Sequence, residues 1–124
     1  LINDSNRRVV TYFNHEIKDA VFNGINWTAI CRQIVEELPK KVYISFDIDG
    51  LDQRYCPNTG TPVPGGLAYE QAVYLLNEMI TSGREIIGFD LVEVAPGDDE
   101  WDAIVGARML YKMCNLALKS KTNA

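Results

Sequence analysis

Three aspartates stand close together in the middle of the chain, directly after a run of apolar residues. Asp47 and Asp49 follow residues 42–46, and Asp52 comes shortly afterwards. The run is β-branched and aromatic with a single serine, which is typical of a buried strand of a parallel sheet. Because Asp47 and Asp49 are two positions apart, an extended backbone directs both side chains to the same side.

Converging carboxylates at the end of a strand favour a bound cation. In open α/β sheets, ligands bind at the carboxyl ends of the strands. Asp47 and Asp49 would repel each other there unless a positive charge lay between them. A hard divalent cation prefers oxygen ligands of this kind. The alternative is that these acids cap a turn and face water, and this stretch by itself leaves both interpretations open.

Hydrophobic periodicity and turn residues predict the elements that must position these acids. A long loop over residues 50–66 follows the central strand, and loops of this length in compact domains are usually functional. The alternation of strands and helices indicates an α/β fold with a parallel sheet. The predicted strands are residues 8–13, 42–46 and 85–94, and the predicted helices are residues 27–38, 67–82 and 101–119, with a short helical turn after Asn14.

Length and composition are those of one globular domain over residues 1–124. The chain is 47% hydrophobic and 23% charged, which excludes a disordered protein. A formal net charge of -5 without a large basic cluster argues against nucleic-acid binding, and no apolar run is long enough for a membrane span. Three cysteines without metal-finger spacing indicate reduced thiols and a cytoplasmic protein. Because the first residue is leucine, we expect a piece of a longer protein.

Two known acidic motifs offer competing interpretations. An EF-hand calcium loop requires glycine at its sixth position and glutamate at its twelfth. Counting from Asp47, Gly50 comes fourth and Asn58 twelfth, so this interpretation fails. In phosphatases of the haloacid dehalogenase type, an apolar strand also ends in DxDG, and Asp47 and Asp49 would then be nucleophile and general acid. Leu51 stands where that family has threonine or valine, which makes this a distant alternative.

Three longer motifs follow one another along the chain, namely SFDIDGLD, CPNTGTPVPGGL and GFDLVEVAP. In this combination and order the chain resembles the ureohydrolases, the family of arginase, agmatinase and formimidoylglutamase. The resemblance extends from about Val9 to Lys119. It implies a three-layer α/β/α fold with a parallel sheet, of which this chain would hold about three strands and three to four helices.

The resemblance also implies a function and its site residues. The reaction would be manganese-dependent hydrolysis of a guanidinium C–N bond with release of urea, at a pair of Mn2+ ions. By position, Asp47 corresponds to the metal-bridging carboxylate and Asp49 to a terminal metal ligand. Glu93 corresponds to the acid that binds the guanidinium group. Thr61, in the loop that borders the site, is assigned with Glu93 to substrate binding. The substrate would be a small cationic guanidino compound such as arginine or agmatine, with arginase preferred over agmatinase, and the protein would be a homo-oligomer.

The most serious departures from the family pattern are motifs that this sequence lacks. Gln53 replaces the usual proline after DGLD, and Ala68 replaces the serine that usually caps the next helix. The GGDHS and DAHxD motifs, which supply the remaining metal ligands, are absent. The histidine assigned as proton shuttle is expected upstream with them, so no catalytic residue is assigned within the chain. We therefore expect the C-terminal portion of a ureohydrolase, with the alternative that it is an inactive fragment.

The remaining candidates have ordinary structural explanations. His15 is the only histidine but stands outside the family's motifs. Cys56 has no histidine partner for a nucleophilic role. Asp52 is expected to cap a turn and Asp90 to form a buried hydrogen bond. The acids of residues 98–102 are expected to stabilise the start of the last helix through its dipole.

Overall fold

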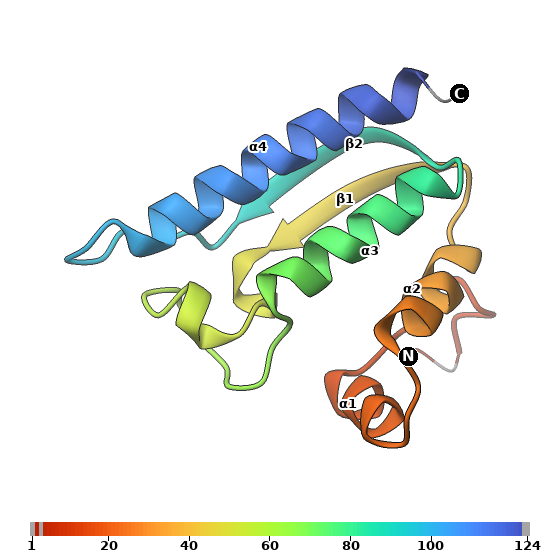
Figure 1. Cartoon of the computed structure of the whole chain (residues 1–124), viewed down its shortest axis with the longest axis horizontal. Coiled ribbons are helices and arrows are strands. Elements are labelled where there is room, and N and C mark those ends of the chain that lie inside the picture. Colours follow the sequence, from red (N-terminus) through yellow and green to blue (C-terminus); the bar gives the residue numbers. More distant parts are fainter. Residues whose placement is uncertain (1, 3, 123–124) are drawn as a thin grey trace. The chain divides into compact units, whose positions relative to one another are not determined.

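Figure 1 shows the computed structural model, which describes residue 2 and residues 4–122. The chain forms two compact units, Leu1–Leu38 and Pro39–Ala124. The first unit contains the helices α1, Asn14–Phe22, and α2, Trp27–Glu36. The second contains the strands β1, Lys41–Asp47, and β2, Glu85–Val92, the helices α3, Tyr69–Thr81, and α4, Trp101–Thr122, and the short 3-10 turns η1, Ile48–Gly50, and η2, Gln53–Tyr55.

Among its described residues the first unit contains helices but no strand, and α2 begins at a capped position. Asn26 Oδ1 accepts a hydrogen bond from the backbone N of Ala29 at 2.9 Å, which satisfies an amide left free at the helix start. The predicted helix is thus confirmed. The predicted strand at residues 8–13 is wrong, because these residues lie outside any helix or strand. A strand needs a neighbouring strand, and this unit has none among its described residues.

The second unit has the predicted α/β class and a parallel sheet. β1 and β2 pair in parallel, with Ile44 aligned with Phe89 and Asp47 aligned with Val92. Helix α3 lies between them in the chain and makes the crossover that a parallel pair requires. Because both strands run in the same direction, their carboxyl ends meet at one edge of the unit. That edge is where Asp47 ends β1.

The core of this unit lies on one side of the sheet. Ile86 of β2 is 1% exposed, and Met109 and Met113 of α4 are fully buried. On the opposite face, Tyr43 is 58% exposed and Val92 is 41% exposed. The prediction that residues 42–46 form a strand is confirmed, but the prediction that this strand is buried is wrong. The physical reason is that α4 packs against one face, and the other face is open in the described part of this unit.

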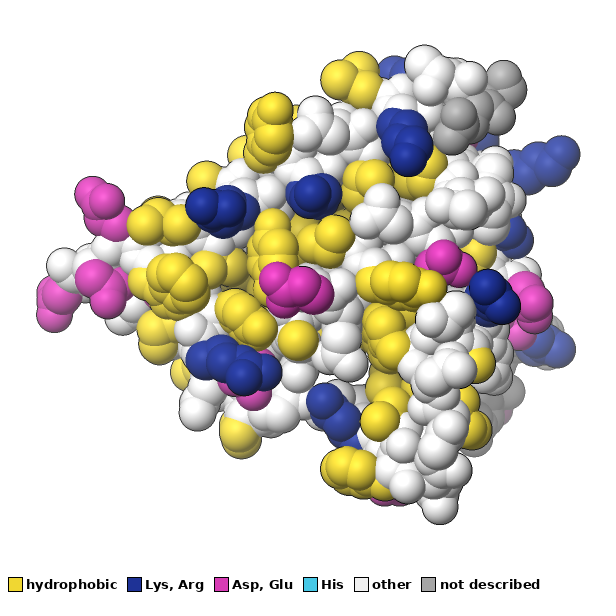
Figure 2. Space-filling model, viewed as in Figure 1, with side chains coloured by type: hydrophobic (Ala, Val, Ile, Leu, Met, Phe, Trp, Pro, Cys, Tyr) yellow, Lys and Arg dark blue, Asp and Glu magenta, His cyan; other side chains and the backbone are white. Residues whose placement is uncertain are grey.

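Helix α4 buries a narrower face than its hydrophobic pattern predicts. The apolar residues Ile104 and Leu110 belong to the hydrophobic pattern of this helix, but they are 43% and 44% exposed. Hydrophobic side chains accordingly lie among lysines and arginines on the surface, and acidic side chains gather at one tip (Figure 2). None of the described helices is both long and apolar enough to cross a membrane. The buried residues of α4 are Asp102, Val105, Gly106, Met109, Met113, Leu116 and Ser120.

Candidate metal and substrate site

Asp47 closes β1 and begins the turn that carries Asp49. Its Oδ1 accepts a hydrogen bond from the backbone N of Asp49 at 3.1 Å, so Asp47 caps the 3-10 turn η1. Ile48, between the two acids, is fully buried and anchors the turn in the core. Alternation around this anchor leaves Asp47 exposed and Asp49 partly exposed at the carboxyl end of the strand.

The loop after the strand returns to these acids. Thr61 Oγ1 donates a short hydrogen bond to Asp49 Oδ2. The loop is tied at its base, because the backbone N of Asp52 donates to the carbonyl of Leu67 at 2.9 Å. The structure therefore brings together two of the predicted site residues, Thr61 and Asp49, although twelve positions separate them.

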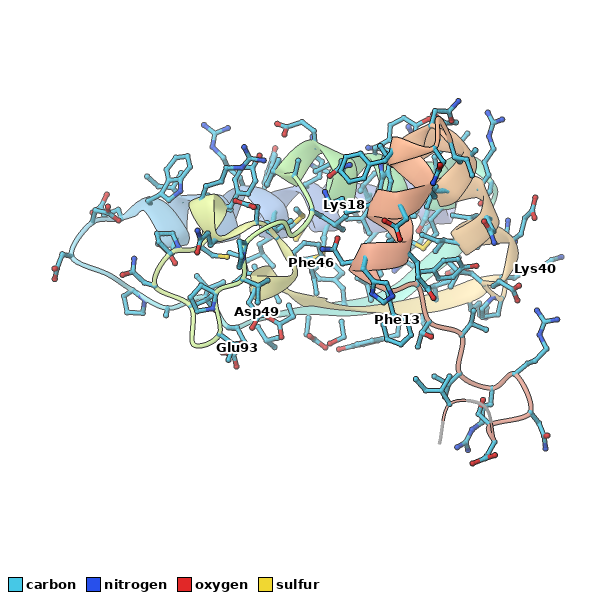
Figure 3. All side chains as sticks on the ribbon, turned by 90° about the horizontal axis from the view of Figure 1, so that it is seen from below. Phe13, Lys18, Lys40, Phe46, Asp49 and Glu93 are labelled. Atoms are coloured by element: carbon cyan, nitrogen blue, oxygen red, sulfur yellow. The ribbon has the colours of Figure 1, made fainter. Side chains whose placement is uncertain are left out.

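Glu93 joins the same edge from the second strand. It follows Val92, which is aligned with Asp47 in the sheet register. Thr59 Oγ1 donates a hydrogen bond to the Glu93 carbonyl at 2.9 Å. A Cβ built on Gly60 would lie 3.3 Å from Glu93 Oε2, so the glutamate side chain lies against the loop. Figure 3 shows Glu93 and Asp49 at the same end of the second unit.

The backbone of Glu93 is in the left-handed region, with a φ of 65°. Residues other than glycine seldom adopt this conformation, and such strain tends to occur at functional sites. The conformation turns the chain sharply directly after β2. The side chain of Glu93 therefore does not continue the alternation of side-chain directions along β2.

Asp47 and Asp49 lie close together at this edge, and their surroundings shift the pKa of Asp47. Desolvation is the largest cause that raises the pKa of Asp47 above its ordinary value. The hydrogen bond from the Asp49 backbone lowers this pKa, whereas the carboxylate of Asp49 raises it. A nearby positive charge would favour the ionised form of both acids. The arrangement therefore suits a cation.

The donors at this edge are of the right kind for a hard metal ion but are too few. Asp47 and Asp49 offer carboxylate oxygens, which Mn2+ and Mg2+ prefer. Among residue 2 and residues 4–122, no group of three or more His, Cys, Asp or Glu is placed to hold a metal ion. The described residues therefore supply only part of the ligand set that a site for such an ion would need.

Asp52 and Cys56 have the structural roles expected of them. Asp52 accepts hydrogen bonds from the backbone N of Arg54 at 3.1 Å and of Gly65 at 2.8 Å, which confirms that it caps a turn. Cys56 is fully buried, and its Sγ donates to the Ile48 carbonyl at 3.2 Å. Burial raises the pKa of the Cys56 thiol, and nearby carboxylates raise it further. A protonated, enclosed thiol is a poor nucleophile.

The expectations for Asp90 and His15 have mixed outcomes. Asp90 accepts hydrogen bonds from Ser45 Oγ at 2.9 Å and from Tyr43 Oη at 3.0 Å. The bonds confirm the prediction of a hydrogen-bonded acid, but they lie on the open face of the sheet and are not buried. His15 stacks on the ring of Phe13 with centroids 5.8 Å apart, a structural contact within the first unit.

Sequence reasoning missed the part played by Asp102. This residue does lie in the first turn of α4, as expected of an acid that favours the helix dipole. It is also 1% exposed, and its two oxygens accept hydrogen bonds from the backbone N and the Nδ2 of Asn58, each at 3.0 Å. Its partner Asn58 lies 44 positions away in the sequence, so no local sequence pattern predicts this pair.

Comparison with known proteins identifies a family and relatives of this sequence. The sequence model of the Arginase family matches residues 5–115. N(1)-aminopropylagmatine ureohydrolase from Thermus thermophilus is 42% identical over 84 residues, which cover 68% of this chain and 28% of that protein. Agmatinase from Serratia proteamaculans is 44% identical over 86 residues, which cover 64% of this chain and 27% of that protein. The chain thus spans little more than a quarter of the length of these curated relatives.

Solved structures of similar fold also match nearly all of this chain but only part of their own. Proclavaminate amidino hydrolase from Streptomyces clavuligerus matches 97% of this chain and 38% of its own, with a TM-score of 0.77 and 25% identity. The crystal structure of agmatine ureohydrolase of Thermoplasma volcanium matches 96% of this chain and 38% of its own, with a TM-score of 0.74 and 26% identity. The fold described above thus matches little more than a third of each of these solved chains.

Proposed function

Because this chain belongs to the arginase family, we propose that it forms part of a ureohydrolase that cleaves a guanidinium C–N bond and releases urea. Water adds to the guanidinium carbon, the bond from that carbon to the alkyl nitrogen breaks, and the nitrogen leaves as an amine. The observation that supports this proposal most directly is the meeting of Asp49, Thr61 and Glu93 at the carboxyl edge of β1 and β2. That edge is where α/β folds bind their ligands.

In this proposal, Asp47 and Asp49 hold part of a manganese site. Their carboxylates are hard oxygen donors, and the hydrogen bond from Thr61 Oγ1 holds one oxygen of Asp49 in place. When manganese ions are bound, they lower the pKa of water so that the nucleophile forms near neutral pH. The described residues supply too few ligands for a metal pair, so we propose that residues outside them complete it.

Glu93 is the proposed binding group for the guanidinium of the substrate. A guanidinium presents a planar fork of N–H donors, which a fixed carboxylate accepts through charge-assisted hydrogen bonds. The backbone of Glu93 is held by the hydrogen bond from Thr59, and its carboxylate lies next to Gly60 of the loop. Its place one residue beyond the strand brings it to the edge that holds Asp47 and Asp49.

Agmatine and its derivatives are the substrate class that we favour over arginine. The sequence expectation put arginase first, but the curated relatives described above are named for agmatine and for aminopropylagmatine. These substrates are amines without an α-carboxylate. The formal net charge of -5 of this chain suits such cations. A cytoplasmic homo-oligomer remains part of the proposal.

The substitution Glu93→Gln tests this function in a complete enzyme that contains the chain. The amide keeps the size of the side chain but removes the charge that holds the guanidinium. We expect urea release to fall by about 30-fold or more, corresponding to about 2 kcal/mol of transition-state stabilisation, while the manganese content stays the same. The exposed Glu100→Gln is the matched control. Loss of manganese from Glu93→Gln would assign Glu93 to the metal instead.

A further inference from the structure

A buried acid outside the site is connected to it through one loop. Asp102 is 1% exposed, and a carboxylate in such surroundings needs partners for both oxygens. Both partners belong to Asn58, through its backbone N and its Nδ2 at 3.0 Å each. The side chain of Asn58 also lies against Gly97, where a Cβ would come within 2.2 Å of Nδ2. Asn58 is therefore fixed both in backbone and in side chain.

The three residues after Asn58 all contact the proposed site. Thr59 Oγ1 donates to the Glu93 carbonyl at 2.9 Å, the Gly60 Cα lies next to the Glu93 carboxylate, and Thr61 Oγ1 donates to Asp49. Neighbouring residues cannot move independently, because consecutive Cα atoms are held about 3.8 Å apart. The place where Asn58 is anchored thus determines where Thr59 and Thr61 meet their acidic partners.

Glu93 needs such an anchor more than its neighbours do. Its left-handed backbone, with a φ of 65°, is unfavourable for a residue with a Cβ. Such a conformation persists only where the surroundings determine it. Thr59 is 5% exposed, and its hydrogen bond holds the Glu93 carbonyl in the orientation that the left-handed backbone requires.

We propose that Asp102 is a positioning residue, which acts through Asn58 and Thr59 to hold Glu93 in its left-handed conformation and Thr61 against Asp49. The significance of this role for catalysis rests on the proposed function, in which Glu93 and Asp49 bind substrate and metal. The positioning itself is a property of this chain and needs neither of them.

A swap of the two polar partners tests the inference. Asn58→Asp places two carboxylates against each other, and like charges at this distance repel. Asp102→Asn alone is the matched control, because the amide of Asn58 can turn and both amides can then pair. The double variant Asn58→Asp/Asp102→Asn restores one carboxylate and one amide with their roles exchanged. All three variants are made in the full 124-residue chain and compared with the unmodified chain by NMR.

Two signals are followed, the hydrogen exchange of the backbone amide at position 58 and the 13Cα and 13Cβ shifts of Glu93, which report its φ. In Asn58→Asp, we expect the amide to exchange at least about tenfold faster and the Glu93 shifts to move toward extended values. The double variant should restore both signals, and the control should retain them. Unchanged Glu93 shifts in a folded Asn58→Asp, or a double variant as disturbed as the single one, would overturn the inference.

If Asn58→Asp fails to fold, the pair Thr59→Val and Thr59→Ser decides the question. Valine keeps the shape of the side chain without the donor, whereas serine keeps the donor. The Glu93 shifts should change in the first variant and stay in the second, and equal shifts in both would overturn the inference. Neither experiment uses metal or substrate. A positive result would therefore stand if urea release failed, and a negative one would leave the proposed function untouched.

Discussion

Asp47 and Asp49 are held by different partners, and this gives them different tolerance to substitution. Asp47 accepts from a backbone amide within its own turn, and an asparagine oxygen could accept the same bond. Asp49 accepts from the Thr61 hydroxyl of a distant loop. In both cases, a change from Asp to Asn removes the charge and keeps most of the shape. Any effect on metal content then reports the charge and not the packing.

We predict that Asp47→Asn lowers the manganese content and urea release of the complete enzyme more than Asp49→Asn does. The family resemblance implies that Asp47 would be the carboxylate shared by both metals. The loss of its charge would then weaken two sites, whereas Asp49 would serve one. Metal analysis of the purified variants and a urea assay measure the difference. The exposed Asp98→Asn serves as a control. A full complement of manganese with near-normal rates in Asp47→Asn would contradict the assignment of the bridge.

The cysteines give a prediction that needs no enzyme activity. Cys114 is exposed, whereas Cys31 and Cys56 are buried. Burial and neighbouring acids also raise the pKa of Cys56, so the fraction of thiolate at any given pH is smaller than for an ordinary cysteine. An alkylating reagent at pH 8 should modify Cys114 first and leave Cys56 intact until the chain unfolds. Mass spectrometry of the labelled peptides measures this order, and early labelling of Cys56 would show that the loop opens.

The residues of the site differ in how far sequence alone could predict them. The roles of Asp47, Asp49 and Glu93 were inferred from motifs and stay predictions. Asp52 was recognised as a cap, and its partner, Arg54, lies only two positions away. The sequence predicted that Asp102 lies at the start of a helix. It could not predict the contact with Asn58, because a contact between residues far apart in the sequence produces no periodic pattern.

Among the elements, the loop between η1 and α3 depends on one close backbone approach. A Cβ on Gly66 would lie 2.5 Å from the carbonyl carbon of Leu51, which is closer than real Cβ atoms come. Here the two ends of the loop are joined by hydrogen bonds, from Leu67 N to Gly50 O at 3.1 Å and from Asp52 N to Leu67 O at 2.9 Å. An added methyl group would have to separate these two backbones.

We therefore predict that Gly66→Ala lowers the free energy of unfolding of the chain by about 1–3 kcal/mol, the usual cost of overpacking. The amides of Asp52 and Leu67 should exchange faster as their hydrogen bonds open. Gly50→Ala is the matched control, because nothing lies within 4 Å of its Cβ position. Thermal unfolding followed by circular dichroism compares the two. Equal stability of Gly66→Ala and Gly50→Ala would show that the loop adjusts.

Among the secondary-structure elements, those with strong hydrophobic periodicity were predictable, whereas the conformation of residues 8–13 was not. Helices α2, α3 and α4 and strands β1 and β2 were all anticipated within a few residues. The run at residues 8–13 has strand-like composition, but strand composition describes fit to a sheet and is not an intrinsic property of the backbone. Without a partner among the described residues, the same composition gives an irregular segment.

At the scale of the whole molecule, the chain alone should be unable to catalyse the proposed reaction. Two carboxylates compete poorly with water for a metal pair, and the described residues offer no group of three ligands. We expect weak manganese binding and no urea release from agmatine or arginine by the purified 124-residue chain. Calorimetry with manganese chloride and a urea assay measure these quantities. Turnover at enzymatic rates would show that fewer ligands suffice than we propose.

The second unit should also associate with further copies of itself. Parallel sheets are nearly always covered on both faces, yet Tyr43 is 58% exposed and Val92 is 41% exposed on one face of this sheet. In the described part of the chain, β1 pairs with β2 alone, so each strand keeps an outer edge of backbone groups that can pair with another chain. An uncovered face with exposed Tyr43 and Val92, next to such an edge, favours intermolecular pairing.

The substitution Tyr43→Lys tests this expectation. A lysine on the exposed face keeps a polar partner close to Asp90, which Tyr43 contacts at 3.0 Å, and opposes pairing by its charge. Light scattering of the purified chain over a range of concentrations should show association that Tyr43→Lys reduces. Val63→Lys introduces the same charge at a loop residue that is 45% exposed and should leave association unchanged. A chain that stays monomeric at every concentration would show that the open face is tolerated, whereas equal effects of both lysines would assign the association to net charge.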